Sequence, residues 1–383
     1  MKICQYIYRA DSGWFKHSGD VQNPDILLAF GSGKDCTGDI LVAWWKQNFP
    51  KAQLIGCSSA GEIIDTEVHT NTIIVSAIQF EKTTFNIQSL DFEESEDSLE
   101  IGIKLAKKLP SNHLKLCLVL SDGLFINGTR LVEGLKQQLP KDTLLTGGMA
   151  GDGKRFSETL VCLNEQFSAR KVVVLGLYGD HIDTQYGSMG GWDSFGPSRL
   201  ITKSTNNILL TLDGQNALEL YKKYLGHHAK DLPYSALRFP LLITLPNGQK
   251  VVRTILSVDE NAGSMTFAGD IPQGSYAELM CANIDRLIDG AADAANDVMA
   301  KNKNTPELAL LISCVGRKLV LGQRIEEEIE VIHDIFGSDT VITGFYSYGE
   351  ICPFDGQHDA ILHNQTMTIT TFRTGSPEAS APA

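Results

Sequence analysis

The chain has 383 residues, which gives room for two or three domains with a buried core. Hydrophobic residues make up 43% and charged residues 21% of the sequence, a globular composition that excludes a wholly disordered chain, a fibre and a small cystine-stapled scaffold. Lys and Arg total 33 against 46 Asp and Glu, so the formal net charge is −13 and disfavours nucleic acid and anionic lipid as partners.

The cysteines and the N-terminal residues favour a cytoplasmic protein. None of the eight cysteines forms a Cys-x-x-Cys pair, and most lie in apolar stretches, so we expect reduced thiols rather than disulfides or a zinc site. The first twenty residues have no long apolar core, which predicts no signal peptide. No stretch approaches ~20 consecutive apolar residues, so we expect no membrane helix.

One plan of elements occurs three times along the chain: strand, helix, strand with a glycine turn, and a last strand. In residues 25–80 these elements are expected at 26–30, 41–49, 54–62 and 72–80. In residues 114–178 they are expected at 116–120, 129–139, 144–152 and 172–178. In residues 307–372 they are expected at 308–313, 324–336, 341–350 and 362–372.

The glycine turns support this repeat. They align as Gly56 to Glu62, Gly147 to Asp152 and Gly344 to Glu350, each a glycine pair followed by an acid. Residues 69–72 (HTNT) also align with 363–366 (HNQT) before the last strands. Glycine permits positive φ or close backbone approach, so we expect sharp turns at strand ends.

These patterns predict an α/β (α+β) fold in which repeated strand–helix–strand units form mixed sheets flanked by helices. The apolar alternation in 362–372 predicts one continuous final strand, with 363, 365, 367 and 369 on one face.

Residues 190–282 differ from the repeat and predict a second domain. A helix over 217–225 has Asp213 as a candidate cap and Gly226 as its stop, and Asn247-Gly248 predicts a hairpin turn. We therefore expect an N-terminal domain at 1–190, a C-terminal domain at 191–373 and a disordered tail at 374–383.

A hydrolase is disfavoured by the spacing around Cys57 and Ser58. These residues lie in a glycine turn after a strand, but the segment from Gly56 to Gly61 is one residue too long for a nucleophile elbow. No base or orienting residue is placed by spacing, so we expect no enzyme.

The acids Glu62, Asp152 and Glu350 allow two interpretations. If the three units pack around an approximate axis, these carboxylates converge and bind an amine-bearing ligand. Alternatively, these turn carboxylates accept hydrogen bonds from backbone N–H groups.

Three histidines are candidate ligand residues. His227 and His228 follow the helix stop at Gly226, where the helix dipole favours an imidazolium. His363 lies on an expected strand and is either hydrogen-bonded or a ligand.

The motifs together resemble the FIST family of bacterial sensory modules, which have an N-terminal and a C-terminal part. The resemblance spans about residues 25–372 and is carried by these runs: 56–63 (GCSSAGEI), 147–153 (GGMAGDG), 212–221 (LDGQNALELY), 344–351 (GFYSYGEI) and 362–367 (LHNQTM). The last run is the most specific. The family implies a ligand-sensing module, with amino acids or similar small molecules as ligands.

A stand-alone branch of the family, the nitric-oxide-sensing haemoproteins called NosP, implies more. It implies haem b, a partner histidine kinase and control of cyclic-di-GMP and biofilm signalling, and it allows a homodimer. His227, His228 or His363 is then the axial donor, and Arg238 or Arg199 binds the propionates. The alternative is a haem-free sensor of an amino acid or other metabolite. The expected ligand-binding residues are Cys57, Ser58, Glu62, Tyr346, Glu350, His363 and Gln365.

Overall fold

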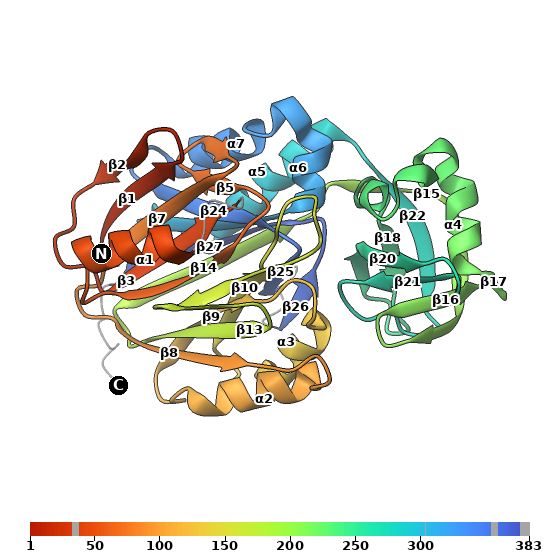
Figure 1. The fold of residues 1–383 in the computed structure, drawn as a ribbon, viewed down its shortest axis with the longest axis horizontal. Coiled ribbons are helices and arrows are strands. Elements are labelled where there is room, and N and C mark those ends of the chain that lie inside the picture. Colours follow the sequence, from red (N-terminus) through yellow and green to blue (C-terminus); the bar gives the residue numbers. More distant parts are fainter. Residues whose placement is uncertain (33–37, 303, 354–358, 376–383) are drawn as a thin grey trace.

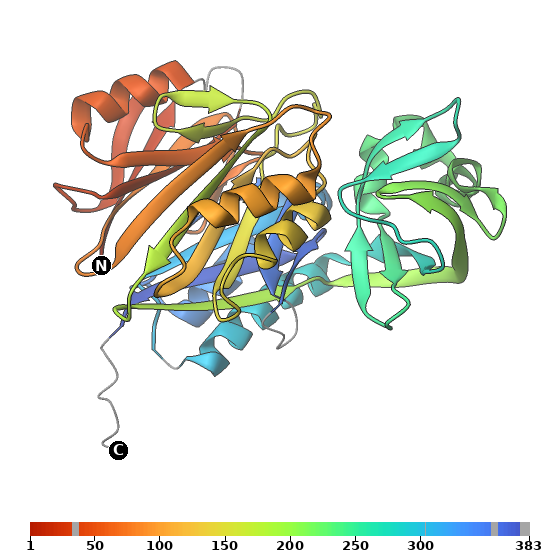
Figure 2. The ribbon, with the colours of Figure 1, turned by 90° about the horizontal axis from the view of Figure 1, so that it is seen from below.

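A computed structural model describes residues 1–32, 38–302, 304–353 and 359–375 of the chain. These residues form a large lobe and a small lobe, joined by two connections near residues 190 and 283 (Figures 1 and 2). The predicted disordered tail falls mostly on 376–383, which lie outside the described residues.

The large lobe contains the three repeated units. The first unit comprises β3 (Ile26–Gly31), α1 (Gly38–Asn48), β4 (Gln53–Ser58), β5 (Glu62–Ile64), β6 (Glu67–His69) and β7 (Thr72–Gln79). The second comprises β9 (Leu114–Ser121), α3 (Gly128–Lys136), β10 (Leu144–Met149), β11 (Val161–Leu163), β12 (Gln166–Ser168) and β13 (Lys171–Tyr178). The third comprises β23 (Leu308–Cys314), α6 (Val315–Leu321), the 3-10 helix η3 (Gly322–Arg324), α7 (Glu327–Phe336), β24 (Val341–Ser347), β25 (Gly349–Pro353), β26 (Ala360–His363) and β27 (Met367–Thr374).

Further elements precede each unit. They are β1 (Lys2–Arg9) and β2 (Gly13–Gly19) before the first, β8 (Thr84–Asp91) and α2 (Ser98–Lys108) before the second, and β14 (Ile182–Met189) and α5 (Ile284–Lys301) before the third. Each unit builds a sheet around a parallel pair, β3/β4, β9/β10 or β23/β24, with the last strand of the unit antiparallel beside it. The predicted α/β fold with mixed sheets and flanking helices is confirmed.

The three units exchange their hairpins in a ring. The hairpin β5–β6 of the first unit pairs with β24 of the third, β25–β26 of the third with β10 of the second, and β11–β12 of the second with β4 of the first. Every unit therefore completes the sheet of another unit, and each of the three sheets contains strands from two units.

The first glycine of each repeated turn allows the parallel strands to approach closely. A Cβ atom at Gly56 or Gly147 would lie 2.1 Å from a carbonyl oxygen of the neighbouring strand, and one at Gly344 would lie 1.9 Å away. Any side chain there would separate the strands, which explains why glycine recurs at this position.

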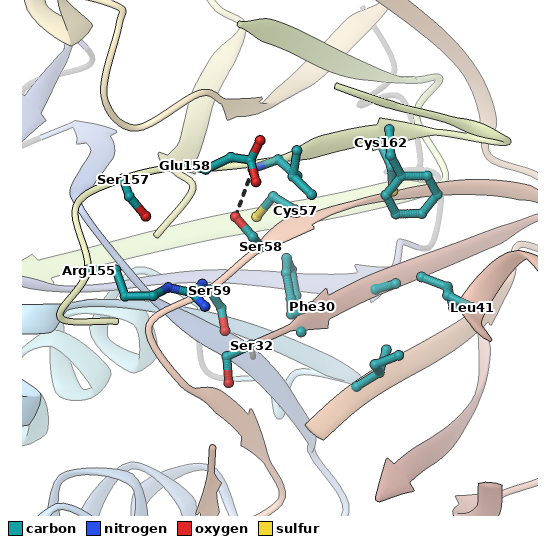
Figure 3. Close-up of a pocket in the computed structure, with 15 residues that line it drawn as sticks. Phe30, Ser32, Leu41, Cys57, Ser58, Ser59, Arg155, Ser157, Glu158 and Cys162 are labelled. Atoms are coloured by element: carbon teal, nitrogen blue, oxygen red, sulfur yellow. Dashed lines mark hydrogen bonds between the residues drawn. The ribbon is translucent and has the colours of Figure 1, made fainter. Parts of the chain in front are cut away.

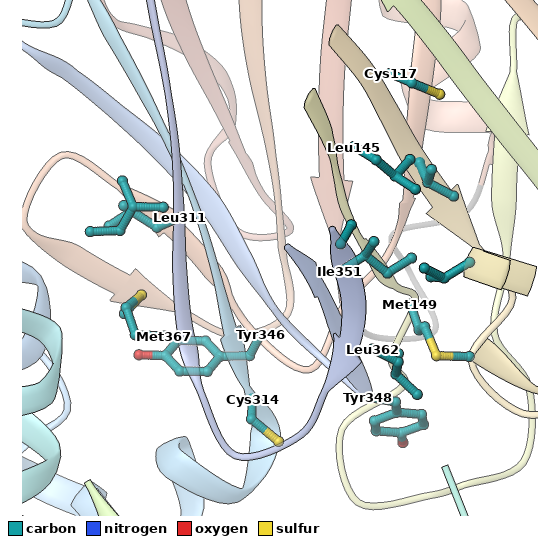
Figure 4. Close-up of a cluster of buried hydrophobic side chains, with 14 of the residues drawn as sticks. Cys117, Leu145, Met149, Leu311, Cys314, Tyr346, Tyr348, Ile351, Leu362 and Met367 are labelled. Carbon is teal, nitrogen blue, oxygen red and sulfur yellow. The ribbon is translucent and has the colours of Figure 1, made fainter. Parts of the chain in front are cut away.

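The core lies between the sheets and their covering helices. Figure 4 shows part of it: Met149 of the second unit lies near Tyr348 of the third, and Tyr346 lies near Met367. Contacts across units follow directly from the hairpin exchange. Among the described residues, no helix is long and apolar enough to cross a bilayer.

The final strand differs from the prediction. Residues 362–372 do not form one strand, because the chain breaks between β26 and β27, which belong to different sheets. Gln365 adopts a left-handed φ of 66° at the break, and the aligned residue Asn71 has a φ of 60° before β7. The prediction that residues 363, 365, 367 and 369 share one face of a single strand is therefore wrong. The alignment of 363–366 with 69–72 agrees with the backbone, because both segments have a left-handed residue at the same aligned position.

The small lobe spans the segment that departed from the repeat. It comprises β15 (Trp192–Thr205), β16 (Ile208–Leu212), β17 (Gln215–Asn216), α4 (Ala217–Leu225), the 3-10 helices η1 (Gly226–Asp231) and η2 (Tyr234–Arg238), β18 (Leu241–Thr244), β19 (Lys250–Arg253), β20 (Ile255–Asp259), β21 (Ser264–Phe267) and β22 (Tyr276–Ala282). The hairpin turn at Asn247-Gly248 joins β18 to β19, as predicted. The predicted cap of α4, Asp213, is wrong, because Asp213 pairs with Arg199. The helix is capped by Asn216, whose side chain accepts a hydrogen bond from the Glu219 N–H.

Strands on both sides of residue 190 share one sheet, because β14 pairs along its whole length with β27. The division into domains at 1–190 and 191–373 stays a prediction.

Candidate functional site

The three glycine turns meet at one end of the large lobe. Three backbone hydrogen bonds, each from an N–H to a carbonyl oxygen, join the turns in a closed ring. The first turn donates to the third (Ala60 to Tyr346, 2.8 Å), the second to the first (Gly151 to Ser58, 3.0 Å) and the third to the second (Tyr348 to Met149, 3.2 Å). A Cβ atom at Gly151 would lie only 3.1 Å from the Ala60 nitrogen. The turns converge as expected, and they pack directly against one another.

Two of the three turn carboxylates are fully buried and are held by their own units. Glu62 accepts from the hydroxyls of Ser59 (2.5 Å) and Thr72 (2.6 Å). Glu350 accepts from Ser347 (2.6 Å) and from the Thr366 hydroxyl (2.9 Å). Burial raises the pKa of both acids, that of Glu350 to about 8. These contacts place Glu62 and Glu350 in the interior and come mainly from hydroxyls, with one backbone N–H, that of Thr366 (3.2 Å), on Glu350.

The third carboxylate, Asp152, organises a loop. It accepts hydrogen bonds from the N–H groups of residues 156, 157 and 158 and from the hydroxyl of Tyr348. Burial acts to raise the pKa of Asp152, but these hydrogen bonds outweigh it and lower the pKa overall. The ionised carboxylate therefore fixes the loop that carries Lys154 and Arg155.

A cleft of about 720 Å³ lies between the lobes beside this loop, and we call it the basic cleft. Among its described lining residues, Lys154, Arg155, Arg238 and Lys318 are cationic and Asp152 alone is anionic. Arg238 is on η2 of the small lobe, and the Lys154 ammonium lies 5.0 Å from the ring centre of Tyr234 on the same element. The cleft is thus built from both lobes and has an excess of positive charge.

Lys318 projects from α6 into the basic cleft. Its ammonium donates to the carbonyl of Ala60 (2.8 Å) and to the Thr70 hydroxyl (2.9 Å), and lies 5.4 Å from the ring centre of Tyr346. A Cβ atom at Gly61 would lie 2.1 Å from the Lys318 nitrogen, so the glycine makes room for the lysine. Burial lowers the pKa of Lys318, partly opposed by the charge of Glu62.

A second cavity, of about 370 Å³, adjoins the basic cleft, and we call it the inner cavity (Figure 3). It lies at the carboxyl ends of the parallel strands β3 and β4, where open α/β sheets bind ligands. Cys57 and Ser58 both line it, as do Ser32 and Arg155, which also line the basic cleft. The Ser58 hydroxyl accepts from the Leu160 N–H (2.9 Å), and burial raises the pKa of Cys57 well above its usual value, so neither is an activated nucleophile.

His363 lines a third cavity of about 620 Å³ between the lobes, with Trp192 and Met280. Its Nε2–H donates to the carbonyl of Cys352 (2.9 Å), and burial lowers its pKa to about 4. The ring is therefore neutral near pH 7.

The run 363–366 fastens the small lobe to the large one. The Gln365 amide, fully buried, donates to the carbonyl of Leu237 (3.1 Å) and to the Thr254 hydroxyl (3.0 Å). The Gln365 carbonyl accepts from the indole N–H of Trp192 (2.9 Å). Gln365, predicted to bind ligand, holds the junction of the lobes, and Tyr346, also predicted to bind ligand, is buried with its hydroxyl on Glu328 (2.7 Å).

The structure places the residues predicted for haem in several different regions. His227 and His228 lie on η1 with their rings 3.9 Å apart, and His227 is exposed. Arg199 is bound to Asp213 (3.0 Å) and to the Tyr224 hydroxyl (2.7 Å). Arg238 lies on the basic cleft, whereas His363 lines the third cavity. No group of three or more His, Cys, Asp or Glu side chains within the described ranges is placed to hold a metal ion.

The sequence reasoning missed three cations of the basic cleft: Lys154, Arg155 and Lys318. Lys154 and Arg155 directly follow the second glycine turn, and that position was the available signal. Lys318 lies on α6, which falls between the strand expected at 308–313 and the helix expected at 324–336. Arg238 was predicted to be functional, but as a haem contact.

Comparisons with known proteins give two family matches. The model of the FIST N domain matches residues 25–215, and that of the FIST C domain matches residues 217–353. No curated protein matches the chain. Among solved structures, a cyanuric acid hydrolase from A. caulinodans is 6% identical, with 92% of this chain and 91% of that chain covered and a TM-score of 0.36, too low to support an argument.

Proposed function

Because the chain belongs to the FIST family, whose domains are small-ligand sensory domains in signalling proteins, we propose that it is a receptor for a small anion. The anion binds in the basic cleft between the two lobes, without haem and without chemical turnover.

The observation that carries this proposal is the charge of the cleft. The chain as a whole has a net charge of −13, yet four cations and one ionised acid line the basic cleft. A concave site with low-dielectric walls concentrates the field of such charges and attracts an oppositely charged ligand. Arg155 and Arg238 also offer the fork of N–H donors that suits a carboxylate or a phosphate.

The helix α6 links this cleft to the connections between the lobes. Lys318 lines the cleft, and the neighbouring Arg317 is fully buried and paired with Glu328 (2.8 Å). The Arg317 guanidinium also donates to the carbonyls of Gly190 and Leu287, both at 2.6 Å. Gly190 leads into the small lobe and Leu287 follows the return from it. A ligand that favours one position of α6 thereby favours one arrangement of the lobes.

A separate protein then reads the arrangement of the lobes. The resemblance to the stand-alone branch makes a histidine kinase acting on cyclic-di-GMP signalling the expected partner. We therefore expect the protein to co-purify with a sensor kinase, and we expect the anion to change the amount of kinase that is recovered.

Thermal unfolding with acetate, succinate, citrate, inorganic phosphate and free amino acids tests the proposal. A ligand that binds only the folded state at 100 times its Kd adds about 2.7 kcal/mol to the free energy of unfolding. We expect at least one anion to raise the melting temperature, and Lys318→Met and Arg238→Ala to abolish the increase.

Lys223→Met is the matched control, because Lys223 is an exposed lysine on α4 outside the lining of the cleft. It should respond to the anion like the unaltered protein. If no anion raises the melting temperature, or if all three variants respond equally, the cleft is not the receptor site.

Nitric oxide sensing through haem is the second candidate. Its structural support is that His363 lines a cavity together with the apolar side chains of Trp192 and Met280. Reconstitution with hemin tests this candidate: a sharp Soret band that shifts with nitric oxide and disappears in His363→Gln supports the haem receptor, and a featureless spectrum rules it out.

A further inference from the structure

The basic cleft and the inner cavity differ in chemistry although they adjoin. Much of the lining of the inner cavity is apolar, with side chains of Phe30, Leu41, Ile73, Leu160 and Phe167. Its two thiols are neutral, because burial raises the pKa of Cys57 well above the usual value and that of Cys162 to about 12. Neutral buried thiols behave as small hydrophobic groups.

The two cavities meet at Arg155 and Ser32, which line both. Figure 3 shows the Arg155 guanidinium reaching toward Ser59 and Ser32 at one side of the inner cavity, while Leu41 and Cys162 lie at the other. Arg155 is held near Asp152, with 3.6 Å between the guanidinium and the carboxylate. Because Asp152 already accepts several hydrogen bonds, the guanidinium retains donors for a ligand.

Among its described lining residues the inner cavity has one acid, Glu158, which is exposed. Its charge disfavours a second anionic group inside the inner cavity. An anion is therefore favoured on the cleft side of Arg155 and an uncharged group on the other side.

Building on the proposed function, we propose that the ligand is an amphipathic organic acid. Its carboxylate binds in the basic cleft at Arg155, and its hydrocarbon part enters the inner cavity between Phe30 and Leu160. The acid is bound and released unchanged.

Calorimetric titration with acetate, butanoate, hexanoate and octanoate tests this assignment on the unaltered protein. Each methylene transferred from water to an apolar site is worth about a fourfold gain in affinity. We expect the Kd to fall by about that factor per methylene until the cavity is full, and 1-octanol to bind far more weakly than octanoate.

Two variants locate the two ends of the ligand. Arg155→Gln changes an exposed side chain and should weaken all four acids by a similar factor. Leu160→Trp adds volume at a half-buried position of the inner cavity and should remove the dependence on chain length while short acids still bind.

The outcomes separate this inference from the proposed function. Equal affinity for acetate and octanoate, with both lost in Lys318→Met, overturns the amphipathic ligand and retains the anion receptor. Chain-length dependence that persists unchanged in Leu160→Trp places the hydrocarbon elsewhere and also overturns the inference. If neither these acids nor any other anion binds, the proposed function fails as well.

Discussion

Replacing Arg317 with Met tests the energetic basis of the junction between the lobes. Arg317 is fully buried and makes two hydrogen bonds to Glu328, at 2.8 and 2.9 Å, besides those to the carbonyls of Gly190 and Leu287. Its removal leaves a buried carboxylate without its cation, a change that costs about 3–5 kcal/mol. The two carbonyls lose their donor, at about 1–3 kcal/mol for each group left unsatisfied. We therefore expect a loss of at least about 3 kcal/mol in the free energy of unfolding.

Urea unfolding followed by tryptophan fluorescence measures this loss. A second variant separates the two contributions: Glu328→Gln added to Arg317→Met removes the unpaired charge but keeps an oxygen that accepts from Tyr346. The double variant should regain part of the stability and not all of it, because the carbonyls of Gly190 and Leu287 stay unpaired.

The matched control is Arg324→Met, which breaks an exposed pairing with Asp285 and Glu327 and should change stability little. A loss below about 1 kcal/mol in Arg317→Met would refute the reasoning, because a buried ion pair with four hydrogen bonds cannot be removed so cheaply. A double variant no more stable than the single one would show that the unpaired charge is not the main cost.

The remaining predictions concern pH. The pKa of Glu350 is about 8 in the folded protein, above its value in the unfolded chain, so the free energy of unfolding falls as pH rises. Between pH 6 and 8 we expect it to fall by about 2 kcal/mol. Urea titrations at several pH values should show a flatter pH dependence in Glu350→Gln. The pKa of His363 is about 4 in the folded protein, below its value in the unfolded chain, so the free energy of unfolding falls as pH falls. Between pH 7 and 5 we expect it to fall by about 2 kcal/mol, and this loss should be absent in His363→Gln. An unchanged slope in either variant would contradict the corresponding assignment.

The sequence by itself determined the elements and their repetition. Apolar runs and helical periodicity depend only on neighbouring residues, so the strands at 26–30, 116–120 and 308–313 were predicted close to their observed bounds. The glycine at the start of each turn was also readable, because close strand approach excludes every other residue type at that position.

The tertiary structure decided how the units combine and where the site lies. The hairpin exchange depends on pairing between distant segments, such as β5 with β24, which no local pattern records. The break at Gln365 arises because β26 and β27 must enter different sheets, so an apolar alternation that suits one strand is divided between two.

The basic cleft has the same origin. Its cations Lys154, Arg238 and Lys318 come from segments separated by about eighty residues each, and in the sequence each is one charged residue among many in an acidic chain. Only the ring of turns and the placement of η2 against α6 bring these charges together. Electrostatic attraction depends on distance in space rather than separation along the chain, so the folded structure alone creates the site.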